Sequence, residues 1–147
     1  MKIGYIDAEN FLSIGKSHIS LDFDQGLVLV EGHNKDNDSF ESNGAGKSSV
    51  SSEALLWCLY GQTVRGLKHD DVINTKTGKD CRVSVSFNLN GKDYSVNRYR
   101  KHKQYKDALH VWENGVDIAA GTNKDTEDRL RTILPVDFDT FLYTTVI

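Results

Sequence analysis

The sequence has 147 residues, of which 38% are hydrophobic and 27% charged, a balance typical of one globular domain with a sizeable core. Its net charge of -3 gives no overall sign of nucleic-acid binding, although a local basic patch is compatible with it. No stretch approaches the roughly 18 apolar residues of a membrane span, and residues 1–10 lack the pattern of a signal peptide. Cys58 and Cys81 are too few for a disulfide framework. We therefore expect a cytoplasmic protein with reduced thiols and no membrane partner.

Alternating and continuous apolar patterns predict the elements of the first half of the chain. Residues 2–9 and 17–23 alternate in the manner of strands. The run Leu27-Val28-Leu29-Val30 is continuously apolar, which predicts a short strand buried on both faces. A polar stretch and a glycine-rich loop follow, and then a helix that we expect to reach about Tyr60.

The second half begins with strands and ends with helices. Residues 81–89 are apolar at every second position, and Asn90-Gly91 is a strong signal for a hairpin turn. With a return strand and a second Asn-Gly pair at 114–115, this predicts an antiparallel meander over 80–118. Thr122 or Asn123 can cap a helix to about Leu134, and Asp137 can cap a last helix over 138–147.

The glycine-rich loop carries the phosphate-facing half of a P-loop. Its glycines allow backbone N–H groups to turn toward phosphates, and the helix N-terminus adds partial positive charge. We expect Lys47 to contact the outer phosphates of ATP and the Ser48 hydroxyl to ligate magnesium. The predicted nucleotide-binding residues form one run: Asn43, Gly44, Ala45, Gly46, Lys47, Ser48 and Ser49.

The motif departs from the strict P-loop pattern at its first glycine. Glu41 occupies that position, and the nearest upstream glycine, Gly32, leaves nine extra residues within the loop. The inserted stretch 33–42 is polar, as in an exposed excursion, and forms either an inert loop or a flap over the nucleotide. The alternative to a phosphate site is a helix that begins after a flexible glycine-rich turn; the buried-type strand before it and the apolar helix after it argue against this.

Three segments of the chain resemble the N-terminal lobe of SbcC-type ATPases, in the SMC-like branch of the ABC ATPases. They are Asn10-Phe11-Leu12-Ser13, the P-loop followed by Glu53 to Gly61, and the closing run Phe138 to Ile147. The stretch Gly61-Gln62-Thr63-Val64-Arg65-Gly66 resembles the bacteriophage members, which are ATPase subunits of recombination exonucleases. The resemblance implies an α/β P-loop NTPase fold with an antiparallel β subdomain.

The resemblance also implies a division of the chain and a set of partners. Residues 1–147 would be one partial head lobe, with a P-loop core at about 1–75, the β meander at about 80–118 and C-terminal helices at about 122–147. The cofactors would be ATP and magnesium. The partners would be the protein's own C-terminal lobe or a second head in a homodimer, an SbcD-like nuclease subunit and double-stranded DNA, in the host cytoplasm if the protein is viral.

In the same family, ATP hydrolysis also uses a glutamine loop, a signature sequence and a hydrophobic strand that ends in Asp-Glu. We find none of these three motifs in this sequence. We therefore expect no catalytic residue within this chain, which would bind ATP without turning it over alone. Ser13 lies where the family contacts nucleotide from the first loop, but Leu12 stands where a basic residue is common, so a simple turn role is the alternative.

The run from residue 98 to 106 interleaves basic and aromatic side chains. That composition suits phosphate contact and base stacking, and the candidates for DNA binding are Arg98, Arg100, Lys101 and Lys103. The alternative is a charged hairpin tip that keeps sheet edges apart.

Two other functions compete with an ATPase lobe that acts with a nuclease. The chain could be a non-hydrolysing interaction module that docks on a larger ATPase head. A small P-loop kinase would need a lid-like arginine cluster, which the sequence does not show.

Overall fold

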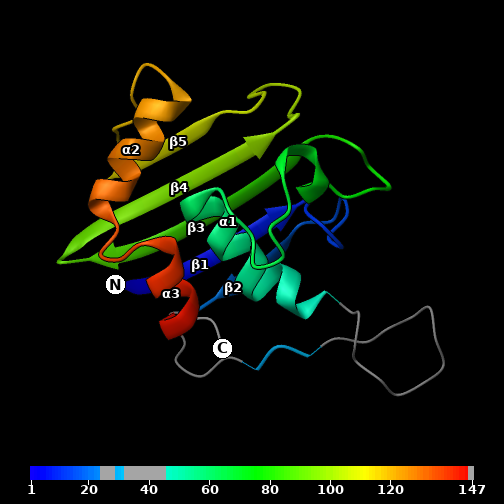
Figure 1. Cartoon of the computed structure of the whole chain (residues 1–147), viewed down its shortest axis with the longest axis horizontal. Coiled ribbons are helices and arrows are strands. Elements are labelled where there is room, and N and C mark those ends of the chain that lie inside the picture. The colour runs from blue at the N-terminus through cyan, green and yellow to red at the C-terminus, as the bar shows by residue number, and fades with distance from the viewer. Residues whose placement is uncertain (24–28, 32–45, 146–147) are drawn as a thin grey trace.

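The computed structural model describes residues 1–23, 29–31 and 46–145, and its centre is a six-stranded antiparallel sheet in the order β2-β1-β3-β4-β5-β6 (Figure 1). The strands are β1 Lys2–Glu9, β2 Ile19–Asp22, β3 Cys81–Leu89, β4 Lys92–Arg100, β5 Leu109–Glu113 and β6 Val116–Asp117. The helices are α1 Ala54–Tyr60, α2 Asn123–Ile133 and α3 Phe138–Thr145, with a π-helical turn at Ser49–Glu53 and a 3-10 turn at His69–Val72.

The predicted hairpins of the meander are confirmed. Asn90 and Gly91 have φ of 53° and 80°, and Asn114 and Gly115 have φ of 49° and 79°. Two consecutive positive φ angles define the turn whose twist matches a two-residue β-hairpin, and asparagine followed by glycine adopts it at low cost. These two turns fix the registers of β3 with β4 and of β5 with β6.

The first strand and the meander belong to one sheet, a pairing that the sequence did not predict. Antiparallel pairs run from Lys2 opposite Asn88 to Glu9 opposite Arg82, with a bulge between Ile3 and Ile6. Strand β1 therefore connects the segment that precedes the P-loop to the hairpins that follow it, although the two lie far apart in the sequence.

The prediction of a buried strand at 27–30 is wrong for the part that the structure describes. Leu29 and Val30 are not in a strand, and Leu29 is 80% exposed. A strand buried on both faces needs neighbours on both sides, and among the described residues the edge strand β2 pairs only with β1. Residues 27 and 28 lie outside the described residues, as do the inserted loop 33–42 and the end of the predicted last helix at 146–147.

The helices pack on one face of the sheet (Figure 1). All seven residues of α1 are buried, because α1 lies between the sheet, α2 and α3. The sheet contributes alternate residues of its strands to this core, among them Ile6, Val83, Val85 and Val96. No helix among the described residues is long and apolar enough to cross a membrane.

The helix ends are set by a glycine after α1 and by the two caps that the sequence predicted for α2 and α3. Gly61 ends α1 in the left-handed conformation with φ of 70°, and its N–H donates to the Trp57 carbonyl. The Thr122 side chain accepts the N–H of Asp125 at the start of α2, and Asp137 Oδ1 accepts the N–H of Thr140 at 2.8 Å in α3. Both predicted caps are confirmed.

One charged side chain of the sheet, Arg98, reaches into the helix layer. Its Nε donates to the Cys58 carbonyl at 3.1 Å, its guanidinium lies 5.9 Å from the centre of the Trp57 ring, and it pairs with Glu127 of α2 at 3.4 Å. Gly61 makes room for the pair, because a Cβ there would lie 2.8 Å from Glu127 Oε1 and 3.2 Å from an Arg98 nitrogen. Arg98 thus joins β4, α1 and α2.

We predict that Arg98→Ala lowers the free energy of unfolding by about 2–4 kcal/mol, since it removes hydrogen bonds to a charged group and leaves Glu127 without its inner partner. The matched control is Arg131→Ala, which removes the other arginine near Glu127, at 3.9 Å and with a side chain that is 58% exposed. That change should cost less than about 1 kcal/mol. Urea unfolding of both variants measures the difference, and equal costs would contradict a structural role for Arg98.

Candidate functional site: the P-loop turn and its supports

The described half of the P-loop is the turn from Gly46 to Ser49 that opens the helix leading into α1. Gly46 has φ of +84°, and its carbonyl accepts the N–H of Ser49 at 3.1 Å and of Val50 at 3.3 Å. Ser48 is exposed and Lys47 is partly exposed, whereas Ser49 is buried. The first three predicted nucleotide-binding residues, Asn43, Gly44 and Ala45, lie outside the described residues.

Ser13 from the first loop touches this turn directly. Its hydroxyl donates to the Ser49 hydroxyl at 3.0 Å. A Cβ on Gly46 would lie 2.6 Å from the Ser13 oxygen, closer than side chains approach one another. The small side chain at 13 and the missing side chain at 46 therefore fit each other, and Ser13 supports the phosphate-facing turn from behind Ser49.

The loop that carries Ser13 is held in a strained conformation by a second segment. Asn10 and Leu12 have positive φ of 52° and 49°, which costs free energy for residues other than glycine. The Leu12 N–H donates to the Val72 carbonyl at 2.8 Å, and the Asn74 side chain donates to the Leu12 carbonyl at 2.7 Å. The Asn10 side chain donates to the Asp80 carbonyl at 2.9 Å. The loop around Ser13 is therefore held by the side-chain amides of Asn10 and Asn74, where regular strand pairing is absent.

Glu53 joins the loop after α1 to the helix that begins at the P-loop, a contact that sequence reasoning missed. It is only 2% exposed, yet one carboxylate oxygen accepts the N–H of Val64 at 2.8 Å and the other pairs with Arg65 Nε at 3.0 Å. Thr63 is also buried, and its hydroxyl accepts the N–H of Leu67. A glutamate within an otherwise apolar helix face was the available signal.

The predicted DNA-binding residues do not form one surface. Arg98 lies in the core between α1 and α2. Arg100 Nε and Lys101 Nζ both contact the Asp70 carboxylate, at 2.8 and 2.5 Å, and these two cations hold the pKa of Asp70 below its usual value. Lys103 is exposed at the tip of the 101–106 hairpin, with its backbone N–H bonded to Asp80.

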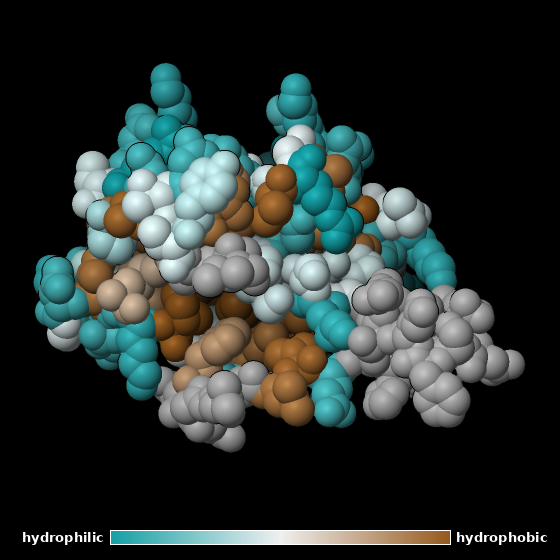
Figure 2. Space-filling view, turned by 60° about the horizontal axis from the view of Figure 1, so that its bottom comes forward, coloured by the Kyte–Doolittle hydropathy of each residue, from teal (hydrophilic) through white to brown (hydrophobic). Residues whose placement is uncertain are grey.

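A hollow of about 260 Å³ adjoins the P-loop turn on the β2 side, and Figure 2 shows hydrophobic side chains open to the surface there. It is lined by Ile19, Leu21, Leu29, Val30, Glu31, Gly46, Lys47 and Val50. The wall is mostly aliphatic, and the P-loop lysine lies at its rim.

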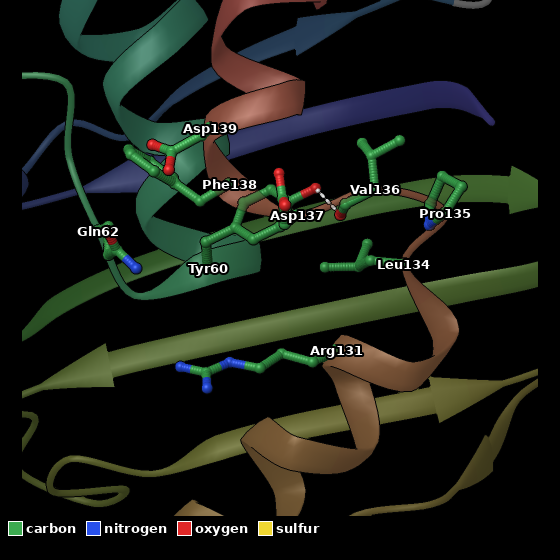
Figure 3. Close-up of a pocket in the computed structure, with 9 residues that line it drawn as sticks. All are labelled: Tyr60, Gln62, Arg131, Leu134, Pro135, Val136, Asp137, Phe138 and Asp139. Carbon is green, nitrogen blue, oxygen red and sulfur yellow. Dashed lines mark hydrogen bonds between the residues drawn. The ribbon is translucent and has the colours of Figure 1, made fainter.

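A second hollow, of about 500 Å³, lies where the end of α1 meets the α2–α3 connection (Figure 3). Tyr60 points across it and donates its hydroxyl to the Val136 carbonyl at 3.1 Å, while its ring contacts Phe138 and Phe141. Burial and the negative charge of Asp137 raise the pKa of Tyr60 to about 12. None of the described P-loop residues, 46–49, lines this hollow, and we assign it to the packing of α3 on α1.

A glycine-led turn at a helix N-terminus, with an adjacent lysine and serine, defines the phosphate site of a P-loop NTPase. The chain belongs to the AAA domain family, whose model matches residues 6–144. The fold is similar to a structure solved in work on ATP-driven dimerization and DNA-stimulated activation of SMC ATPases, with a TM-score of 0.54, 17% identity, and coverage of 100% of this chain and 93% of that one.

Curated relatives confirm the predicted resemblance to SbcC-type ATPases. The chain is 31% identical over 67% of its length to the SbcC component of the SbcCD nuclease of Deinococcus radiodurans, and 34% identical over 63% to the DNA double-strand break repair Rad50 ATPase of Archaeoglobus fulgidus. It is 23% identical over 95% to exonuclease subunit 2 of Enterobacteria phage T4. The chain spans 11%, 9% and 23% of these relatives, respectively.

The fit between Gly46 and Ser13 predicts the effect of a single methyl group. Gly46→Ala adds the strain of a positive φ, about 1–3 kcal/mol, and a contact with Ser13. Gly78→Ala is the matched control, because Gly78 has φ of +67° and nothing lies within 4 Å of its Cβ position. We expect a larger loss of thermal stability at Gly46 than at Gly78. The double variant Ser13→Ala/Gly46→Ala should lose less than the sum of the two single variants, since Ser13→Ala removes the clash as well as the hydrogen bond to Ser49. Equal melting temperatures for the two single variants would contradict the contact.

The Tyr60 hydrogen bond predicts a stability loss at alkaline pH. Because the folded state raises the pKa of Tyr60 from 10.0 to about 12, the neutral phenol stabilises the fold below pH 10, and this contribution is lost as the pH rises toward 12. Tyr60→Phe should cost about 0.5–1.5 kcal/mol at neutral pH and should weaken the decline above pH 10. Urea unfolding at pH 8 and 10.5 tests this, and an unchanged pH profile in the variant would refute it.

Proposed function

We propose that this chain binds ATP with magnesium as part of an SMC/SbcC-like ATPase that acts with a nuclease subunit in DNA recombination, repair or end processing. The observation that carries the proposal is the Gly46–Ser49 turn, shaped by a glycine with positive φ and supported by Ser13. The names of the relatives, a component of an SbcCD nuclease, Rad50 repair ATPases and an exonuclease subunit, support the larger activity.

We assign different roles to the residues of the turn according to their exposure to solvent and their contacts. Ser48 is exposed, so its hydroxyl is available as an oxygen ligand for magnesium, the ligand type that this hard cation prefers. Lys47 is partly exposed and lines the hollow beside the turn, and we assign to its ammonium the neutralisation of the outer phosphates. The hydroxyl of Ser49 is bonded to Ser13, so Ser49 contributes to the shape of the turn through this bond and its backbone.

Hydrolysis needs groups beyond those of this turn. Phosphoryl transfer is accelerated mainly by positioning and charge stabilisation around the attacking water and the leaving phosphate. Around the turn the structure describes a cation, hydroxyls and backbone donors. In the complete protein, its own C-terminal lobe would pack beside this turn and a second head would close over the nucleotide. The chain therefore contributes binding, and other parts of the assembly contribute catalysis.

The aliphatic hollow beside Lys47 favours one other function, an interaction module that docks on a larger ATPase head without using ATP. The two proposals differ in what Lys47 does. In a pure docking module, Lys47 would contribute only to the binding of the partner at the hollow, and added nucleotide should not change the affinity for that partner. In the ATPase lobe, nucleotide binding depends on the lysine.

Titration calorimetry with ATP and magnesium tests the proposal. We expect Lys47→Ala to weaken binding at least about tenfold, because a charge-assisted contact to phosphate is lost. Lys124→Ala, an exposed lysine on α2, should leave the affinity unchanged. The purified chain should bind without measurable magnesium-dependent turnover. Equal affinity of Lys47→Ala and the unmodified chain would contradict ATP binding at this turn. Turnover by the purified chain that Lys47→Ala abolishes would contradict the claim that catalysis needs other parts of the assembly.

A further inference from the structure

A strip of aromatic side chains runs over the sheet face opposite the helices, along β5 and into the 101–106 hairpin. Tyr99 and Tyr105 lie 4.5 Å apart between ring centres, Tyr105 and His110 lie 5.8 Å apart, and His110 stacks on Trp112 at 5.5 Å with an interplanar angle of 18°. We call Tyr99, Tyr105, His110 and Trp112 the aromatic strip. His102 packs against its end, 5.2 Å from Tyr105.

The register of the sheet places the strip away from the core. Leu109 and Val111 of β5 are buried toward the helices, so the alternating residues His110 and Trp112 point to the other face. Tyr99 is buried beneath its neighbours, but Tyr105 is 39% exposed and His110 and Trp112 are partly exposed. The nucleotide site and the core therefore make no use of these rings.

Small polar side chains form a shelf beside the strip. Ser95 lies opposite Trp112 and Ser86 opposite Ser95, while Asn97 lies opposite His110. On this face the residues of β3, β4 and β5 include no aliphatic side chain. The surface thus combines ring faces with hydroxyl and amide groups that both donate and accept hydrogen bonds. That chemistry matches unpaired nucleobases better than an apolar protein interface.

Lysines lie at one end of the strip, whereas Arg82, opposite Tyr99 on the same face, is paired with Asp7. The hairpin tip 101–106 holds Lys101, Lys103 and Lys106, and the carboxylates of Asp80 and Asp107 accept the backbone N–H groups of Lys103 and Lys101. Lys101 is paired with Asp70, and the Lys106 ammonium donates to the Lys103 carbonyl, so the exposed Lys103 is the cation best placed for an added anion. At the other end, Asp117 lies 4.0 Å from His110 and disfavours phosphate there.

We propose that the aromatic strip binds single-stranded DNA, with bases stacked on Trp112 and Tyr105 and the adjoining phosphates near Lys103. A duplex hides the faces of its bases within its own stack, so the strip selects unpaired strands or frayed ends. Stacking of this kind tolerates any base, because every base has a π face. The proposal rests on the proposed function only in taking DNA as the partner, and it involves no P-loop residue.

Fluorescence titration with a thymidine oligonucleotide tests the proposal without ATP. Trp57 is buried and gives a constant background, whereas Trp112 should be quenched when a base stacks on it. Trp112→Ala and Tyr105→Ala, followed by fluorescence anisotropy of a labelled oligonucleotide, should each weaken binding about 5- to 100-fold. Trp112→Phe keeps a ring and should retain most of the affinity. Tyr143→Ala, an exposed tyrosine on α3, is the matched control and should bind as the unmodified chain does.

Two further ligands separate stacking from charge. A strand of the same length with abasic sites keeps the phosphates and loses the bases, and it should bind far more weakly; a duplex should quench Trp112 little. Lys103→Glu should weaken oligonucleotide binding and lower its salt dependence. Equal binding of the abasic strand or the duplex, or full affinity in both alanine variants with their folds intact by circular dichroism, would overturn the proposal. Lys47→Ala should leave all of these titrations unchanged, so their outcome is distinct from that of ATP binding.

Discussion

Helix α1 packs against the sheet, α2 and α3 at once, and the burial of all seven of its residues determines where the phosphate-facing turn can lie. A helix that is enclosed on every side cannot shift without opening the core, because interiors are packed as densely as organic crystals. The Gly46–Ser49 turn continues into this helix through the π-helical turn. Its position relative to the sheet is therefore inherited from the hydrophobic packing of α1.

Polar contacts then decide the details that packing leaves open. Glu53 binds the loop that follows α1, Arg98 binds the last turn of α1 to α2, and Asn74 holds the strained loop that carries Ser13. Each of these groups is buried or half-buried, and its loss would leave a polar partner unsatisfied. The described loops around the P-loop turn thus keep one conformation although they contain little regular structure.

The sequence was sufficient for features that local rules determine. Alternation marked β3 and β4, Asn-Gly pairs marked the turns, and Thr122 and Asp137 marked helix starts, because each depends on neighbours within a few residues. Long-range features were missed: the pairing of β1 with β3, the inward direction of Arg98, and the contact of Ser13 with Gly46. The apolar run 27–30 misled at Leu29 and Val30 for a related reason, because an apolar pattern predicts burial but does not identify the neighbouring segment that would bury it. For the site, the motif gave Lys47 and Ser48, whereas the supports Glu53 and Asn74 required the fold.

The two faces of the sheet separate the proposed nucleotide site from the proposed DNA site. The face of the sheet that the helices cover forms the hydrophobic core. The aliphatic hollow beside Lys47 lies at the β2 side of this face. The opposite face carries serine, asparagine and the aromatic strip, and it is rigid because β3 and β4 pair along nine residues. Arg98 and Tyr99 are adjacent in sequence and face opposite sides, so β4 contacts both α1 and the strip. Strand β4 therefore joins the two faces of the sheet, because its inward side chains hold α1 and its outward side chains carry part of the strip.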